Sequence, residues 1–391
     1  MPLMNIAPQI RFIITSSKAK LTQSDIEYIR DYISKYIIDD MTVDDTIATI
    51  SRHGLIPLVY HTLRDLSSDI DIPSTLLSKL QARYKLIAQK NMLMSAELIK
   101  IVKLLAKHDI KAIPFKGPSL AQLAYGDITL RVFGDLDILV NKEDIDRVYQ
   151  ILQTIHYERY LSLTPYQYQV WLKYSHDLGL TNKSKNIHLE MHWSFFDEDY
   201  PMQIDMDSFD STTSTTINNN SIDTFEIESL LFYLSIHGSK HLFVRISWIK
   251  DLDMMIRLQD IHWDKIDKLM KTNPDFTKMF LLGLQLSWHL YSTPLPTDIK
   301  EQIANHPELK TLQQFIIDSW ATTHHKFAQT KMMLLLFPNL KTRLSYLHKI
   351  ILKPQLHEYW YIDLPKSLHW GYYLIRPYLL IKKYLITPPN K

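Results

Sequence analysis

The sequence predicts an α+β protein that is mostly helical, with a small mixed sheet between helical N- and C-terminal regions. Glycine is scarce, with eight residues in 391, and this scarcity favours helices. Short runs that alternate apolar and polar residues occur only at about 109–200, whereas the segments on both sides have the 3.6-residue apolar period of helices. We therefore expect a helical region at 1–108, a sheet-containing core at 109–210, a linker or long loop at 211–224 and a helical domain at 225–391.

In the N-terminal region, Ser24 is a candidate N-cap for a helix over Asp25–Ile38, and residues 82–107 keep the apolar spacing of a second helix. The pattern changes after this point. Lys111–Phe115 is a short apolar run that ends in a Lys-Gly-Pro turn, which predicts a strand. Ser119–Tyr125 is suited to one short helix.

Asp135–Val140 alternates acidic and aliphatic residues, which predicts a strand with one polar and one buried face. Lys142–Ile155 has the pattern of an amphipathic helix. The runs His176–Thr181 and Ile187–Trp193 predict a β-hairpin around an Asn-Lys-Ser-Lys turn at 182–185.

The stretch Ser211–Thr224 is rich in Ser, Thr and Asn, which is why we expect a linker or long loop there. Ile227–Leu258 is predicted as one helix, and no clear strand follows it. No internal repeat is visible.

The chain contains no cysteine, which excludes disulfides, thiolate zinc sites and a cysteine nucleophile. Its first residues lack the charged and apolar regions of a signal peptide. The most apolar stretch, Leu368–Ile386, contains Arg376, Pro377, Lys382 and Lys383, which are costly at the centre of a bilayer. We therefore expect a cytoplasmic protein without stable membrane insertion, in which this stretch is a packed or interfacial amphipathic helix.

Positive charge is concentrated near the C-terminus. Residues 331–391 hold ten Lys or Arg and two acids, whereas the whole chain has a net charge of only +2. The basic residues are interleaved with the aromatic residues Trp360, Tyr361, Trp370, Tyr372 and Tyr373. This tail is either a surface for a polyanion or a basic helical surface with an aromatic core face.

Asp135 and Asp137 are two positions apart on a predicted strand, so their side chains leave the same face, with Cα atoms about 6.6 Å apart. Carboxylates this close repel one another unless a cation lies between them. Oxygen ligands of this kind suit Mg²⁺ or Mn²⁺, which can clamp the oxygens of a phosphoryl displacement. The alternative is an exposed strand end whose acids face water.

A third acid is expected on the second strand of the hairpin. Alternation places His188, Glu190 and His192 on one face, and burying Glu190 between apolar neighbours is costly unless a partner such as a shared cation compensates. A solvated strand face is the alternative. If the hairpin closes over 182–185, Asp177 lies opposite Glu190 as a possible fourth acid.

These motifs together resemble the uncharacterised nucleotidyltransferase family of the DNA polymerase β-like superfamily. The resemblance covers roughly residues 45–265, and its motifs are Arg52–Leu58, Phe115–Leu120, Leu130–Arg131, Gly134–Val140, Leu189–Trp193, His237–His241, Arg245, Trp248 and Asp251. It implies a mixed sheet with helices, a nucleotidyltransferase core at 109–210, and metal ions held by the catalytic residues Asp135, Asp137 and Glu190.

The resemblance also implies roles for supporting residues. The nucleotide-binding candidates are Lys116, Gly117, Ser119 and Arg131, and the substrate-binding candidates are His192, His237, Lys240, His241 and Asp251. Arg131 is expected either to contact phosphate or to offset the charge of Asp135 and Asp137. Two positions depart from the superfamily: Pro118 removes one backbone donor from the phosphate turn, and the third acid is Glu instead of Asp.

On the expected helix Ile227–Leu258, His237, His241, Trp248 and Asp251 fall on one side, as either a wall of the cleft or an exposed polar face. A zinc peptidase is not indicated by the two histidines, because Gly238 stands where its Glu would be.

We therefore expect transfer of a nucleoside monophosphate from a nucleoside triphosphate to a hydroxyl acceptor, with Mg²⁺ or Mn²⁺ as cofactor. The acceptor can be a small molecule, a peptide, a sugar or RNA. The motifs are also similar to nucleotidyltransferase toxins of abortive-infection systems, some of which act on tRNA. A non-catalytic nucleotide-binding module that retains the fold is a further alternative, favoured by Pro118.

Overall fold

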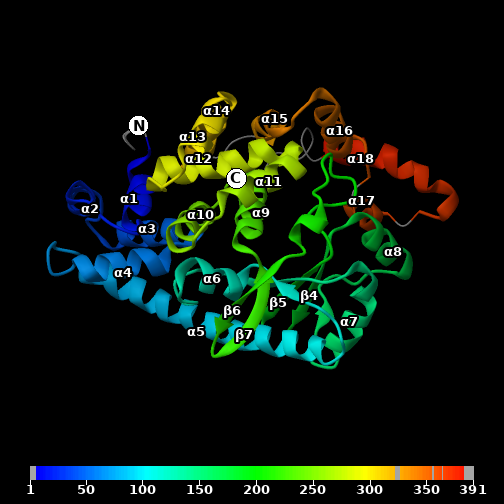
Figure 1. Cartoon of the computed structure of the whole chain (residues 1–391), viewed down its shortest axis with the longest axis horizontal. Helices are drawn as coiled ribbons and strands as arrows, with labels where there is room; N and C mark the ends of the chain where they lie inside the picture. The colour runs from blue at the N-terminus through cyan, green and yellow to red at the C-terminus, as the bar shows by residue number, and fades with distance from the viewer. Residues whose placement is uncertain (1–5, 322–325, 355, 363, 383–391) are drawn as a thin grey trace.

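The computed structural model describes residues 6–321, 326–354, 356–362 and 364–382, and it confirms the mostly helical α+β class (Figure 1). The N-terminal helices are α1 (Pro8–Ser16), α2 (Gln23–Tyr36), α3 (Asp40–Arg52), α4 (Ile56–Leu66) and α5 (Ser74–Ala106). The middle of the chain forms β1 (Ile113–Pro114), α6 (Gly117–Tyr125), β2 (Asp135–Leu139), η2 (Lys142–Asp144), α7 (Ile145–Gln153), β3 (Glu158–Arg159), α8 (Pro165–Tyr174), β4 (Asp177–Asn182), β5 (Ile187–His192), η3 (Met206–Phe209), β6 (Thr212–Ile217) and β7 (Asn220–Phe225).

The rest of the described chain is helical. Its elements are α9 (Ile227–Lys240), α10 (Ile246–Leu258), α11 (Trp263–Thr272), η4 (Pro274–Phe276), α12 (Thr277–Tyr291), α13 (Thr297–Ala304), α14 (Glu308–Ser319), α15 (Lys326–Leu336), α16 (Leu340–Ile351), α17 (Leu356–Tyr361), η5 (Lys366–Gly371) and α18 (Tyr372–Ile381).

Helix α2 begins two residues earlier than the sequence predicts. Thr22, not Ser24, is its N-cap: the Thr22 hydroxyl accepts the backbone N–H of Asp25, and the Asp25 carboxylate accepts the N–H of Thr22. This reciprocal pair is a capping box, which satisfies two backbone donors at once. Ser24 lies inside the first turn, where its hydroxyl contacts that of Thr22.

Helix α5 connects two hydrophobic cores. It has 33 residues, which corresponds to a length of about 50 Å, and Figure 1 shows it running beneath the N-terminal helices and on to the sheet. Its first half contributes Leu76 and Leu80 to a core shared with α1–α4 and α9–α14. Its second half contributes residues such as Met94 and Leu105 to the core beneath the sheet.

The main sheet has five strands in the order β1-β2-β5-β4-β3, and it is mixed as predicted. Strands β2 and β5 are parallel, whereas the other neighbouring pairs are antiparallel. The predicted hairpin is present as β4 and β5, but its register differs from the prediction by two residues. Asn182 pairs with Ile187 across a four-residue turn in which Asn186 has a φ of 52°, so Asp177 lies opposite His192 and not opposite Glu190.

The prediction of a linker or long loop at 211–224 is wrong, because this segment forms the antiparallel hairpin β6–β7. Ile217 pairs with Asn220, and the two residues between them, Asn218 and Asn219, have φ values of 48° and 60°. Such a two-residue turn with two left-handed residues matches the twist of a hairpin, and Asn tolerates it well. Ile217 and Ile222 anchor the hairpin in the core beneath the sheet.

The single helix expected over Ile227–Leu258 is also wrong, because the chain breaks into α9 and α10. Leu242 and Phe243 have φ values of 48° and 42°, so the chain turns at these two residues. Arg245 is the N-cap residue of α10. The fully buried Phe243 ring packs on Gly238, where a Cβ atom would lie 2.2 Å from the Phe243 Cε1 atom.

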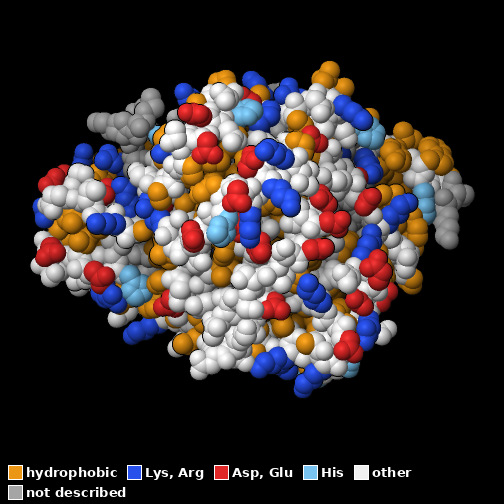
Figure 2. Space-filling model, viewed as in Figure 1, with side chains coloured by type: hydrophobic (Ala, Val, Ile, Leu, Met, Phe, Trp, Pro, Cys, Tyr) orange, Lys and Arg blue, Asp and Glu red, His pale blue; other side chains and the backbone are white. Residues whose placement is uncertain are grey.

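Helix α15 packs against α14, and the C-terminal helices α16–α18 lie at one end of the molecule, where α17 contacts α8 (Figure 1). Figure 2 shows hydrophobic side chains at the edge that α18 occupies in Figure 1, and Tyr373, Leu374, Tyr378 and Ile381 of α18 are between 49% and 65% exposed. Of the basic and apolar tail considered in the sequence, positions 383–391 and the side chain of Trp360 lie outside the described residues. Within the part of the chain that is described, no helix is both long and apolar enough to cross a membrane.

The packing of Phe243 on Gly238 gives a testable prediction. Gly238→Ala should lower the free energy of unfolding by about 2 kcal/mol, because the new methyl group overpacks against a ring that has no room to move. Urea denaturation measures this change. Gly134→Ala is the matched control, because no atom lies within 4 Å of its Cβ position and stability should stay within about 0.5 kcal/mol. Equal stability of the two variants would contradict the packing described here.

Candidate active site

The parallel pairing of β2 and β5 brings acidic residues from two distant segments together. Asp137 pairs with Glu190, and Asp135 pairs with His188. Leu136, Ile138, Leu189 and Met191 point into the core beneath the sheet. Because side chains alternate along a strand, Asp135, Asp137, Glu190 and His192 share the opposite face.

Asp137 is the most enclosed of these acids, with 2% of its side chain exposed. Its Oδ1 atom accepts from Lys116 Nζ at 2.8 Å and lies 3.3 Å from His192 Nε2, while its buried Oδ2 atom has no hydrogen-bond partner. Burial alone would raise the pKa of Asp137, but the charges of Lys116 and His192 outweigh burial and hold the pKa well below its usual value. Asp137 is therefore a carboxylate with one free oxygen.

The other two acids lie closer to solvent. The Glu190 side chain is 39% exposed, and its Oε2 atom is 3.4 Å from His192 Nε2. Burial, followed by the charges of Asp137 and Glu190, raises the pKa of Asp135, and the charges of Lys116 and Arg131 oppose this rise. The three carboxylates therefore repel one another, as expected for a site that is completed by cations.

The residues present fit a divalent metal ion. One ligand atom each from Asp137, Glu190 and His192 lie within 4.8 Å of one another, and Asp137 keeps a buried oxygen without a partner. A buried carboxylate oxygen without a hydrogen-bond partner is suited to bind a cation. Asp135, on the same strand face, is the further oxygen ligand expected from the sequence.

The Lys-Gly-Pro turn lies directly against the acidic strand. Gly117 begins α6 with a φ of 54°, and a Cβ atom there would lie 3.3 Å from the Asp135 carbonyl oxygen. A side chain would therefore be strained as well as crowded. The first turn of α6 is thus held next to Asp135. Its backbone N–H groups, which have no partner within the helix, lie at the end of the sheet that carries the carboxylates. Pro118 fits the first turn but supplies no N–H.

Ser119, expected as a phosphate-binding hydroxyl, is fully buried, and its Oγ atom has no hydrogen-bond partner. Its backbone N–H belongs to the first turn of α6. The hydroxyl itself is enclosed in this conformation.

Arg131 and Asp251 form a buried ion pair behind the acidic strand. Arg131 Nε donates to both Asp251 oxygens at 3.1 Å, and the Tyr125 hydroxyl donates to Asp251 Oδ1 at 2.8 Å. Burial raises the pKa of Asp251, although Arg131 and Tyr125 oppose this. Arg131 thus has a carboxylate partner of its own, and its charge also acts on Asp135. Asp251 is only 2% exposed, so its carboxylate, predicted to bind substrate, is enclosed in this ion pair.

The loop that carries Arg131 is held by Asn91 of α5. The Asn91 amide donates to the carbonyl oxygens of Ile128 and Arg131, both at 2.7 Å, and its side chain is buried. Sequence reasoning did not single out Asn91. A polar residue within the apolar stripe of a long helix was the signal that could have found it.

Helix α9 and the start of α10 place aromatic and basic side chains over the polar face. Lys116 Nζ lies 5.8 Å from the Tyr233 ring centre, and His237 packs against His241 and Trp248 with ring centres 4.9 and 5.4 Å apart. Burial, followed by the charge of Lys116, lowers the pKa of His237 well below its usual value, so His237 is neutral at physiological pH. The helix break therefore keeps His237, His241 and Trp248 together but turns Asp251 inward.

Lys240 is the last residue of α9, and its side chain contacts the segment that follows β5. Its Nζ atom is 5.0 Å from the Phe196 ring centre and 5.6 Å from that of Tyr200. Burial lowers the pKa of Lys240, while Asp197 opposes this shift. Lys240 thus lies over the aromatic rings of the segment that follows β5, where Asp197 and Asp177 are the acids that act on its charge.

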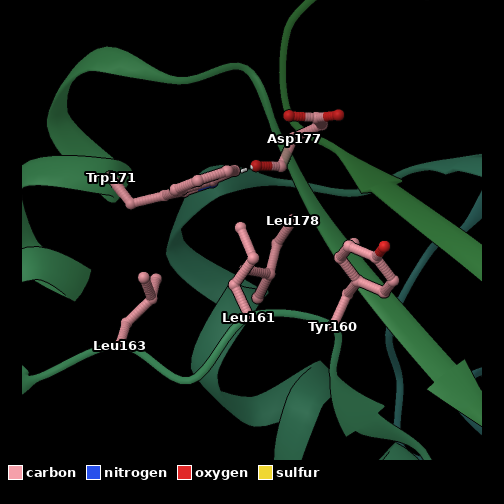
Figure 3. A pocket seen from close by; sticks show the side chains of 7 residues that line it. Tyr160, Leu161, Leu163, Trp171, Asp177 and Leu178 are labelled. Atoms are coloured by element: carbon pink, nitrogen blue, oxygen red, sulfur yellow. Dashed lines mark hydrogen bonds between the residues drawn. The ribbon is translucent and has the colours of Figure 1, made fainter. Parts of the chain in front are cut away.

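An apolar pocket of about 180 Å³ opens beside the start of β4 (Figure 3). Its lining is formed by Tyr160, Leu161, Leu163, Trp171, Asp177, Leu178 and Gly179. Gly179 pairs with Glu190 across the strands, and the Tyr160 side chain lies against it, with its Cβ atom 3.6 Å from the position that a Cβ atom of Gly179 would take. Tyr233 and the pocket aromatic residues were missed in the sequence, because only the fold brings them to the acidic strands.

Fold and site together define a nucleotidyl-transferring class of protein: a mixed sheet with carboxylates on adjacent strands beside a glycine turn. The family model described as "uncharacterised nucleotidyltransferase" matches residues 39–292. The match spans more than half of the chain, and the protein belongs to this family, as its motifs predicted.

A solved structure that is similar to part of the chain is the crystal structure of an antigenic nucleotidyltransferase-like protein from Paracoccidioides brasiliensis. The sequences are 15% identical, the alignment covers 50% of this chain and 91% of that chain, and the TM-score is 0.28. Comparison with curated proteins gives no match.

The buried ion pair gives a second prediction. Asp251→Asn should lower the free energy of unfolding by about 3 kcal/mol or more, because the Arg131 charge would be left without its partner in the interior. Chemical denaturation measures this loss. The control is Asp65→Asn, whose ion pair with Arg64 is exposed and should contribute less than about 1 kcal/mol. Similar losses in both variants would show that the buried Arg131–Asp251 pair contributes no more to stability than an exposed ion pair.

Proposed function

We propose that this protein transfers a nucleoside monophosphate from a nucleoside triphosphate to a hydroxyl acceptor and requires Mg²⁺ or Mn²⁺. The observation that carries this proposal is the Asp137 carboxylate, which is buried and ionised, has a free oxygen, and pairs through its strand with Glu190. Membership of a nucleotidyltransferase family supports the same chemistry.

In the proposed reaction, the acceptor oxygen forms a bond to the α-phosphorus, and the bond from that phosphorus to the bridging oxygen breaks. Pyrophosphate leaves with the electron pair, and the hydroxyl proton passes to a base or to water. Asp135, Asp137 and Glu190 are the residues that would hold the divalent ions. Such ions neutralise the phosphates and lower the pKa of the attacking hydroxyl when they are bound.

The phosphates are proposed to lie at the Lys-Gly-Pro turn. Backbone N–H groups of the first turn of α6, at Gly117 and Ser119, face anions favourably because they have no partner within the helix. Lys116 lies beside them and now neutralises Asp137. Once cations share the charge of Asp137, the Lys116 ammonium is free to pair with a phosphate oxygen.

The acceptor is proposed to approach from the side of α9 and β4. Neutral His237 can accept a hydrogen bond from a hydroxyl, while His192, Lys240 and His241 supply polar and charged groups around it. The apolar pocket beside Gly179 can take a flat or apolar part of the acceptor. Mass spectrometry of candidate acceptors after incubation with each of the four triphosphates will identify the nucleotide and the acceptor.

The central test is removal of the charge of Asp137. Asp137→Asn should reduce transfer of label from α-labelled triphosphate at least about a thousandfold, which corresponds to about 4 kcal/mol of transition-state stabilisation. The protein should remain folded in far-ultraviolet circular dichroism. Asp44→Asn, on an exposed ion pair with Lys79, is the matched control and should retain full transfer. An active Asp137→Asn enzyme would refute the proposal.

A binding module without catalysis is distinguished by calorimetry. The proposed enzyme should bind ATP with heat that depends on Mg²⁺, and Asp135→Asn should abolish that dependence. Heat that is the same with and without Mg²⁺ would favour a module whose phosphate turn is impaired by Pro118.

RNA is a second candidate acceptor, favoured by the exposed aromatic residues of the basic C-terminal helices, such as Trp370 and Tyr373. If tRNA is the acceptor, its affinity should fall at least about tenfold between 50 and 200 mM salt, because counterions are released on binding. Trp370→Ala should weaken binding by about 1–3 kcal/mol through loss of base stacking. Filter binding measures both effects, and affinity that is insensitive to salt would favour a small acceptor.

A further inference from the structure

A second cluster of metal-binding groups lies at the end of the β4–β5 pair. His176 precedes β4, Asp177 begins it, and Asp177 pairs with His192 at the end of β5. One ligand atom from each of these three residues lies within 4.8 Å of the other two. Only His192 is shared with the carboxylate site.

The His192 ring has one nitrogen engaged and one without a partner. Its Nε2 atom faces Asp137 Oδ1 at 3.3 Å and Glu190 Oε2 at 3.4 Å. Its Nδ1 atom is buried and makes no hydrogen bond, although the whole side chain is only 4% exposed. With Nε2–H donating to the carboxylates, Nδ1 carries a lone pair that a metal ion can accept.

His176 also has one ring nitrogen engaged by a carboxylate, but here the engaged nitrogen is Nδ1 and not Nε2. Its Nδ1 atom is 2.7 Å from Asp197 Oδ1, which leaves Nε2 for another partner. Asp197 is itself held by Lys349, whose Nζ atom is 2.9 Å from Asp197 Oδ2. A histidine whose far nitrogen donates to a carboxylate is the usual arrangement of a metal ligand, because the carboxylate fixes the tautomer and the ring orientation.

Asp177 supplies an oxygen to the same cluster. Its Oδ1 atom accepts from Ser175 Oγ at 3.1 Å, and the second oxygen remains for a ligand. Figure 3 shows the Asp177 carboxylate turned away from the side chains of Leu161, Leu163 and Leu178. The carboxylate therefore points away from the apolar side chains of the pocket that Asp177 helps to line.

We propose that His176, Asp177 and His192 bind a transition-metal ion of the Zn²⁺ type at a site separate from the carboxylate site. Two imidazoles and one carboxylate suit Zn²⁺ and Co²⁺, whereas Mg²⁺ prefers oxygen ligands alone. This ion fixes the His192 tautomer whose Nε2–H contacts Asp137 and Glu190. The second site thereby positions two acids of the first, and its existence does not depend on the proposed transfer reaction.

The test uses the whole protein, freed of metal by a chelator and then titrated with Co²⁺ in excess Mg²⁺, which competes with Co²⁺ for the carboxylate site. The visible absorption of Co²⁺ reports low-symmetry coordination with nitrogen ligands, and calorimetry with Zn²⁺ gives the affinity. The wild-type protein should bind one equivalent. His176→Gln and Asp177→Asn should each bind at least about tenfold more weakly, since loss of a ligand costs no less than loss of a supporting contact.

Two controls separate this site from its surroundings. His188→Gln, on the same strand but exposed, should bind Co²⁺ like the wild type. Asp135→Asn should also bind Co²⁺ like the wild type while losing Mg²⁺-dependent ATP binding. Circular dichroism in chelator confirms that each variant is folded, and Asp177→Asn keeps the volume of the original side chain.

Three results would overturn the proposal. The first is the absence of a Co²⁺ equivalent in the wild-type protein. The second is unchanged binding in both His176→Gln and Asp177→Asn. The third is loss of Co²⁺ binding in Asp135→Asn alone, which would place the ion among the carboxylates. Because the readout uses metal without nucleotide, its failure is distinct from failure of the proposed transferase activity.

Discussion

The parallel pairing of β2 with β5 is the interaction on which the rest of the site depends. It sets Asp137 beside Glu190 although 53 positions separate them, and it leaves Asp135 and His192 on the same face. The opposite face is buried against α5 and α7, which holds the strands in this register, because a slip of one residue would turn the acids into the core. Repulsion among three carboxylates is the cost, and Lys116 and His192 offset part of it.

The surroundings make this arrangement rigid. Asn91 of the long helix α5 holds the loop before β2, and the buried Arg131–Asp251 pair ties the same loop to α10. The turn at Gly117 then brings the start of α6 against Asp135. A site held by rigid elements on several sides loses little free energy to reorganisation when it binds charged ligands.

His192 has a central position because each of its ring nitrogens faces a different environment. Nε2 lies between Asp137 and Glu190, whereas Nδ1 is buried and has no hydrogen-bond partner. The carboxylate site offers mainly oxygen ligands, whereas the proposed second site combines two imidazoles with one carboxylate. This difference lets the two proposed ion sites prefer different metals while sharing His192.

Features set by local chemistry were predictable from the sequence: the predominance of helices, the strand at Asp135, the common face of Glu190 and His192, and the motifs of the family. Tertiary structure decided the rest. Asp177 pairs with His192 because the hairpin turn lies at 183–186 and not at 182–185. The 212–225 hairpin forms around two left-handed Asn residues, and α9 ends where Phe243 packs on Gly238. Asp251 forms its ion pair with Arg131, which lies 120 positions earlier in the sequence. Side-chain alternation and helical period are local properties, whereas register, chain breaks and buried ion pairs depend on which distant surfaces pack together.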